Sequence, residues 1–189
     1  MYLLVGLGNP GREHVINRHN LGFLAVEAWV LLKGEEFRKK EFHSETARLK
    51  VGGEEVLAMK PQTYMNRSGD AVHEAMQFYK VPMENVIVLH DEIDLLPKTF
   101  RIKRGGGHAG HNGLRSLMHH GENFLRFRMG VGRPPHKDMD VADYVLGNLD
   151  KDELSFWEEE MPNVCAAIDL CLQGKMDQAM NQFHKKAKE

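Results

Sequence analysis

The residues of this 189-residue chain that are best suited to chemistry lie in short polar clusters beside apolar segments. Five such clusters occur where a strand is expected to end or a helix to begin: Asn9, residues 18–20 (RHN), residues 65–66 (MN), residues 90–92 (HDE) and residues 108–112 (HAGHN). In open α/β sheets, functional sites gather at the carboxyl ends of the strands. We therefore expect these clusters to converge on one site.

Asparagine recurs in these clusters, at Asn9, Asn20, Asn66 and Asn112. An amide side chain both donates and accepts hydrogen bonds but is neither an acid nor a base, so this set suits a neutral, peptide-like substrate. Proton transfer is then left to histidine. His19 is the candidate base, and Asp91 is the candidate carboxylate that orients it and stabilises its charged form. A lone histidine at a helix start more often caps or packs, but the neighbouring clusters favour catalysis here.

Metal catalysis and a covalent nucleophile have weaker support in the sequence. The HExxH motif is absent, and His108 and His111 are loosely spaced in a glycine-rich loop. No serine lies in a G-x-S-x-G turn. Cys165 and Cys171 are six residues apart within an apolar pattern, which predicts buried thiols in a reducing cytoplasm rather than a disulfide, a zinc site or a reactive thiolate.

The segment GLGNPG (residues 6–11) fits the dinucleotide-binding pattern G-x-G-x-x-G, but its surroundings do not. Pro10 removes an N–H from the loop, and the helical pattern begins only near residue 21. Residues 34–42, where a second apolar strand should follow, are mostly charged. We interpret the segment as a rigid turn that presents Asn9.

Positive charge is concentrated in one segment of the chain, although the net charge is only −2. Residues 98–133 contain eight lysines and arginines and one acidic residue, Glu122, whereas residues 150–160 contain six acidic residues and one lysine. This distribution fits a local phosphate-binding surface, and by itself it fits a solvated face equally well.

The hydrophobic pattern mixes strands with helices. Strands are expected at residues 2–5, 85–90, 99–103 and 125–131, and a hairpin at 46–60 that turns at Gly52-Gly53. Helices are expected at residues 21–32, at 72–79 with Ser68 as the N-cap, at 114–119, and over the last forty residues, which Pro162 and Gly174 divide into three pieces. The helix at 21–32 is apolar almost all round, so we expect it to be buried between layers. Residues 33–45 are expected to be irregular.

This organisation predicts an α/β fold: a single domain over residues 1–189, with a twisted mixed central sheet flanked by helices on both faces and followed by C-terminal helices. The sequence contains no apolar run of the roughly 20 residues that a membrane span needs and no signal-peptide pattern, so a cytoplasmic location is expected.

Five motifs, in this order and spacing, resemble bacterial-type peptidyl-tRNA hydrolase: GLGNPG, NRHNLG, KPQTYMNRSG, HDEIDL and GGGHAGHNGL. The resemblance extends from Leu3 to about Leu146, and the C-terminal helices fit the family in length. It implies hydrolysis of the ester between peptide and tRNA, which frees tRNA for reuse, by a monomer that needs neither metal nor cofactor. The sequence departs from the family at His14 and Asn17, where tyrosine and threonine are usual.

Carried over by motif, the resemblance implies a role for each of eight residues. His19 would be the catalytic base and Asp91 its partner. Substrate would be bound by Asn9, Met65, Asn66 and Asn112, and a tRNA phosphate by Lys103 and Arg128. Two alternatives stay open: an RNA-binding module without catalysis, which leaves the Asn/His/Asp gathering unexplained, and a metal-dependent esterase.

Overall fold

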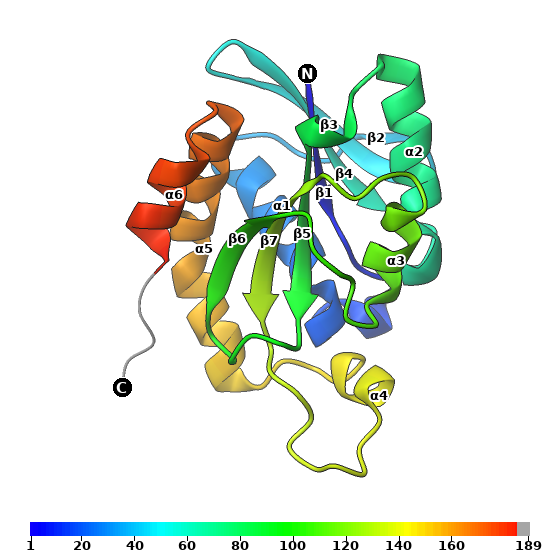
Figure 1. Ribbon diagram of the computed structural model, residues 1–189, viewed down its shortest axis with the longest axis vertical. Helices are drawn as coiled ribbons and strands as arrows, with labels where there is room; N and C mark the ends of the chain where they lie inside the picture. Colours follow the sequence, from blue (N-terminus) through cyan, green and yellow to red (C-terminus); the bar gives the residue numbers. More distant parts are fainter. Residues whose placement is uncertain (185–189) are drawn as a thin grey trace.

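The computed structural model describes residues 1–184, in which a central sheet lies between two layers of helices (Figure 1). The seven strands are β1 (Tyr2–Gly6), β2 (Lys39–Glu41), β3 (Ser44–Val51), β4 (Glu54–Pro61), β5 (Val86–Glu92), β6 (Phe100–Arg104) and β7 (Leu125–Gly130), in the order β2-β3-β4-β1-β5-β7-β6. The central pairs β4-β1, β1-β5 and β5-β7 are parallel, and the pairs nearer the edges are antiparallel. The predicted mixed sheet is confirmed.

The helices divide between the two faces of this sheet. One face packs against α1 (Leu21–Leu32), α5 (Lys151–Leu172) and α6 (Met176–Phe183), and the other against α2 (Ser68–Tyr79) and α3 (Asn112–Met118). A short helix, α4 (Val141–Val145), lies beyond the end of β7 (Figure 1). Within residues 1–184, no helix combines the length and apolar character that crossing a membrane requires.

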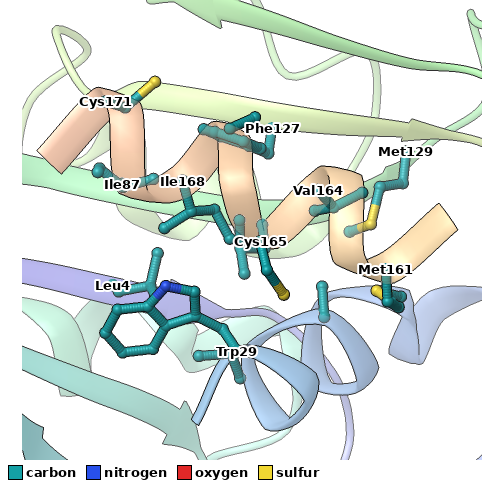
Figure 2. Close-up of a cluster of buried hydrophobic side chains, with 14 of the residues drawn as sticks. Leu4, Trp29, Ile87, Phe127, Met129, Met161, Val164, Cys165, Ile168 and Cys171 are labelled. Atoms are coloured by element: carbon teal, nitrogen blue, oxygen red, sulfur yellow. The ribbon is translucent and has the colours of Figure 1, made fainter. Parts of the chain in front are cut away.

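Two hydrophobic cores follow from the alternation of side chains along the strands. On β1, Leu4 points into the core under α1 and α5, whereas Leu3 and Val5 point into the core under α2 and α3. Figure 2 shows the first core, in which Ile168 of α5 lies over the sheet near Trp29 of α1.

The two cysteines lie in the first core, as predicted. Cys165 and Cys171 are free and buried on α5. Burial raises the pKa of each thiol to about 12. Both therefore behave as small apolar side chains.

The C-terminal region contains two helices in the described residues rather than the three pieces predicted. The break at Gly174 is confirmed, but α5 continues through Pro162. A proline inside a helix deprives the carbonyl four residues earlier of its N–H partner. That carbonyl belongs to Glu158, and both Glu158 and Pro162 are exposed, so water can replace the lost partner.

Three further local predictions are wrong. Ser68 is the first residue of α2 rather than its cap, and its hydroxyl donates to the carbonyl of Met65 at 2.9 Å. Residues 33–45 include the short strand β2, which pairs with β3 despite its charged sequence because it lies at the sheet edge. The apolar helix α1 is not buried all round, since Leu31 and Leu32 are 72% and 60% exposed.

Candidate active site

The carboxyl ends of the parallel strands β4, β1 and β5 lie at one edge of the sheet, and the polar clusters meet there. The first loop follows β1, the short 3-10 helix Met65–Arg67 follows β4, and Asp91 is the last but one residue of strand β5. They border a cavity of about 530 Å³, the site cavity. Six predicted site residues line it: Asn9, His19, Met65, Asn66, Asp91 and Asn112.

The glycine-rich first loop is rigid for reasons of packing. A Cβ on Gly6 would lie 2.3 Å from the carbonyl oxygen of Gly22, and one on Gly8 would lie 2.6 Å from the ring of Phe23. These glycines let α1 lie directly on β1. They serve close packing of helix on strand, which agrees with the rejection of a dinucleotide site.

Asn9 is held by hydrogen bonds on both its backbone and its side chain. Its backbone N–H donates to Oδ1 of Asn20, and Nδ2 of Asn20 donates back to the Asn9 carbonyl, each at 2.9 Å. Its side-chain Oδ1 accepts the backbone N–H of Met65 at 2.7 Å. One of the two lone pairs of this oxygen is therefore occupied, and Asn9 can offer a substrate its Nδ2–H donors. Asn20 has a structural role in the loop.

His19 and Asp91 form a buried pair. His19 Nδ1 lies 3.0 Å from Oδ1 and 2.9 Å from Oδ2 of Asp91, and the two side chains are 11% and 2% exposed. Burial lowers the pKa of His19, but the charge and hydrogen bond of Asp91 outweigh it, so the pKa is raised above its ordinary value. Nε2 of His19 makes no hydrogen bond to any residue in the described part of the chain. His19 lines the site cavity, so this nitrogen is available to accept a proton from a water molecule in the cavity.

A second histidine, which the sequence reasoning did not assign to catalysis, shares the same carboxylate. Nε2 of His111 lies 2.9 Å from Oδ1 of Asp91. Its other nitrogen, Nδ1, accepts the backbone N–H groups of Gly113 and Leu114 at 3.1 and 3.3 Å, so His111 is the N-cap of α3. The sequence carried no signal for this role, because the helix was expected to begin at residue 114 and histidine is not among the usual N-cap residues.

Asp91 therefore accepts hydrogen bonds from both histidines. Burial alone would raise its pKa, but the charge and hydrogen bonds of His19 and His111 hold the pKa below its ordinary value. A carboxylate of this kind stays ionised throughout the neutral range.

His19, Asp91 and His111 also form a group whose possible metal-ligand atoms lie within 4.8 Å of one another, the one such group of three or more in residues 1–184. However, Nδ1 of His19 and Nε2 of His111 each lie 2.9–3.0 Å from Asp91 oxygens, which is the distance of an N–H···O hydrogen bond. His111 also spends its second nitrogen on the cap of α3. The geometry fits a hydrogen-bonded network better than a metal centre.

Lys103 and Arg128 lie outside the site cavity, on strands β6 and β7. The register pairs Lys103 with Arg126 and Arg101 with Arg128, which places four basic side chains on one face of the sheet. Arg128 donates through Nε to the buried Glu92 at 2.9 Å, and Arg126 is itself buried. Lys103 is exposed. The basic segment, residues 98–133, is thus partly a structural network and partly a surface.

The two positions that depart from the family pattern contact each other. His14 Nδ1 lies 2.6 Å from Asn17 Oδ1, and Asn17 Nδ2 donates to Asn148 Oδ1 at 2.9 Å. These contacts join the first loop to the segment that follows α4. Neither residue lines the site cavity.

Comparisons with known proteins agree with one another. A family model described as peptidyl-tRNA hydrolase matches residues 3–189. The chain is 42% identical over 190 residues to the peptidyl-tRNA hydrolase of Anaeromyxobacter sp. (strain K), covering 100% of this chain and 98% of the relative. It is 44% identical over 186 residues to that of Azorhizobium caulinodans, covering 97% and 90%.

Solved structures show the same similarity. A crystal structure of peptidyl-tRNA hydrolase from Acinetobacter baumannii superposes with a TM-score of 0.91 at 40% identity, over 97% of this chain and 94% of that chain. A complex of peptidyl-tRNA hydrolase with N-propanol superposes with a TM-score of 0.92 at 39% identity, over 100% and 97%.

Proposed function

Because the chain belongs to the peptidyl-tRNA hydrolase family, whose activity releases tRNA from peptidyl-tRNA, we propose that His19 is the base that activates water for this reaction. One observation carries the assignment. His19 lines the site cavity, its Nδ1 is held by the buried carboxylate of Asp91, and its Nε2 makes no hydrogen bond within the described residues.

The proposed reaction needs only groups of the protein, water and substrate. Nε2 of His19 takes a proton from water as the water oxygen attacks the ester carbonyl, and Asp91 stabilises the imidazolium that forms. Side-chain amides of Asn66 and Asn112, both exposed and lining the site cavity, suit the oxyanion of the tetrahedral intermediate. Each such donor contributes roughly 3 kcal/mol in comparable sites. The proton on His19 then passes to the departing ribose oxygen as the ester bond breaks.

The two halves of the substrate would be held separately. Nδ2 of Asn9, together with Met65, Asn66 and Asn112, would hold the peptide side of the ester. Lys103 and Arg128, on β6 and β7 beyond β5, would hold a tRNA phosphate through charge and without reading bases. The sheet order supports this division, because the strands of Arg128 and Lys103, β7 and β6, both lie on the same side of β5, the strand of Asp91.

We further propose that residues 1–189 act as one domain and as a monomer in the cytoplasm. The substrate is a product of translation, and the thiols of Cys165 and Cys171 are free and buried. Light scattering tests the monomer against the chain mass of 21.6 kDa.

The decisive experiment measures tRNA release from a peptidyl-tRNA in the presence of EDTA, for the native chain and for His19→Ala. We expect activity to survive EDTA, and His19→Ala to reduce turnover about 10²- to 10⁴-fold, the usual range for a general base. His119→Ala, an exposed histidine at the end of α3, is the matched control and should keep native turnover.

Each contrary result points to one alternative. Near-native turnover by folded His19→Ala would reject His19 as the base. Loss with EDTA and recovery with zinc would favour a metal-dependent esterase. Binding of tRNA without turnover by the native chain would favour an RNA-binding module.

A further inference from the structure

Asp91 is surrounded by three histidines that come from three different elements. His19 lies in the 3-10 helix before α1, His90 precedes Asp91 on β5, and His111 caps α3. The ring centroids of His19 and His111 are 4.7 Å apart, and those of His90 and His111 are 5.4 Å apart. In such a cluster any of the three rings could take up the proton. The hydrogen-bond partners of each ring decide which histidine titrates.

The partners of His111 leave it one protonation state. Its Nδ1 accepts two backbone N–H groups at the start of α3, so Nδ1 must carry a lone pair. The proton of the neutral ring is therefore on Nε2, which donates to Asp91 Oδ1 at 2.9 Å. Protonating His111 would place an N–H against the two backbone N–H donors.

His90 is restricted in the opposite sense. The Nε–H of Arg126, which can only donate, points to Nε2 of His90 at 3.2 Å, so this nitrogen is an acceptor. Nδ1 then carries the proton and donates to the carbonyl of Asp91 at 2.8 Å. His111 and His90 each have one nitrogen that faces an N–H donor, whereas neither nitrogen of His19 faces a donor in the described residues, so only His19 can take up a second proton without such a clash.

We propose that His111 is a positioning residue: a permanently neutral Nε2–H donor, fixed by the cap of α3, that holds Asp91 for His19. This inference rests on the proposed role of His19 as base. It adds that the helix carrying Asn112 is tied through its capping residue to the carboxylate of the catalytic pair. Substrate contacts on α3 and the orientation of His19 are thereby fixed together.

The shared carboxylate also moderates how strongly His19 binds its proton. Oδ1 of Asp91 accepts hydrogen bonds from both His111 Nε2 and His19 Nδ1, so the carboxylate stabilises the charged form of His19 less than it would without His111. The other ionisable groups that face this cluster are His90, Glu92 and Arg126, and Arg126 lies 3.6 Å from Glu92 as an ion pair. Removing the His111 donor leaves those partners in place and should raise the pKa of His19.

The variant His111→Ser isolates the contact with Asp91, because serine is a good N-cap for α3 but is too short to reach the carboxylate. We expect the acidic limb of the kcat/KM–pH profile for peptidyl-tRNA to move up by about half to one pH unit, a shift of the size that a lost hydrogen bond causes. The control His119→Ala, at the C-terminal end of the same helix, should keep the native midpoint. An unchanged midpoint in folded His111→Ser would overturn the proposal.

Imidazole ¹⁵N NMR of the native protein provides a readout independent of turnover. His111 should show the neutral Nε2–H tautomer from pH 5 to 8, while His19 titrates. An Nδ1–H tautomer, or titration of His111 near its ordinary pKa, would contradict the inference. Full turnover by His19→Ala would instead reject the proposed role of His19 as the base, and the NMR result for His111 would still stand by itself.

Discussion

Replacing Asp91 with asparagine tests whether the carboxylate sets the tautomer of His19. In the native site Asp91 accepts from two donors, His19 Nδ1–H at 2.9 and 3.0 Å and His111 Nε2–H at 2.9 Å. The amide that replaces it has one acceptor oxygen and one NH₂ group. If the oxygen stays with His111, the NH₂ group faces His19 Nδ1. That nitrogen must then accept, which moves the proton of His19 to Nε2, the atom that should receive the proton of water.

The expected size of this effect follows from two contributions. The same substitution in a Ser-His-Asp triad lowers kcat by about 10⁴, or about 5.5 kcal/mol, through the wrong tautomer. Asp91→Asn also removes the charge that raises the pKa of His19, while the burial that lowers it remains. A neighbouring carboxylate is worth about 1–3 pKa units. We therefore expect kcat/KM to fall by roughly 10² to 10⁴, and the acidic limb to move to lower pH.

The measurement is tRNA release from peptidyl-tRNA between pH 5 and 9, with urea unfolding to show that the variant is folded. Asp177→Asn, an exposed carboxylate on α6, is the control and should reproduce the native profile. An acidic limb that stays at the native pH would refute the pairing of Asp91 with His19, whatever the loss in rate.

Two further predictions concern charge. The double change Lys103→Ala/Arg128→Ala should raise KM for peptidyl-tRNA with little change in kcat. It should also flatten the dependence of log affinity on log salt concentration by about one unit per cation. Measuring KM at several salt concentrations tests this, and an unchanged slope would exclude both residues from phosphate binding. Because burial lowers the pKa of His90 and of His111, the unfolded chain binds protons below about pH 6.5 that the folded protein does not. The free energy of unfolding should therefore fall as pH drops, by at most about 1.4 kcal/mol per pH unit for each histidine. The raised pKa of His19 contributes with the opposite sign, above its unfolded pKa. Urea unfolding at pH 7.5 and 5.5 tests this, and equal stability at the two pH values would contradict the locked tautomers.

The sequence predicted the elements and most of the site because both depend on local patterns. Apolar runs marked the central strands, and the polar clusters beside them contained His19 and Asp91. The structure then placed six predicted residues around one cavity. Long-range contacts were harder. That Asn9 spends its oxygen on the backbone of Met65 depends on a hydrogen bond across 56 positions, which no local pattern encodes.

The errors have similar physical causes. Pro162 was expected to break a helix because propensity is local, but tertiary packing of α5 on the sheet outweighs one missing hydrogen bond at an exposed position. His111 was seen only as a loose metal-ligand candidate because its two partners lie in different directions, one along its own helix and one on β5. Arg128 was expected to bind a tRNA phosphate, which stays a prediction, and its bond to Glu92 on the neighbouring strand could not be read from the charge count.

The attachment of the catalytic segment to the C-terminal part of the chain has a consequence for biosynthesis. Arg18, next to His19, pairs with Glu153 in the first turn of α5 at 2.9 Å, although 135 positions separate them. Strand β1 also lies in the middle of the sheet, between β4 and β5. During synthesis from the N-terminus, the residues that form the site emerge early but gain their supports late. A nascent copy, which is itself a peptidyl-tRNA, therefore lacks a completed site until α5 has left the ribosome.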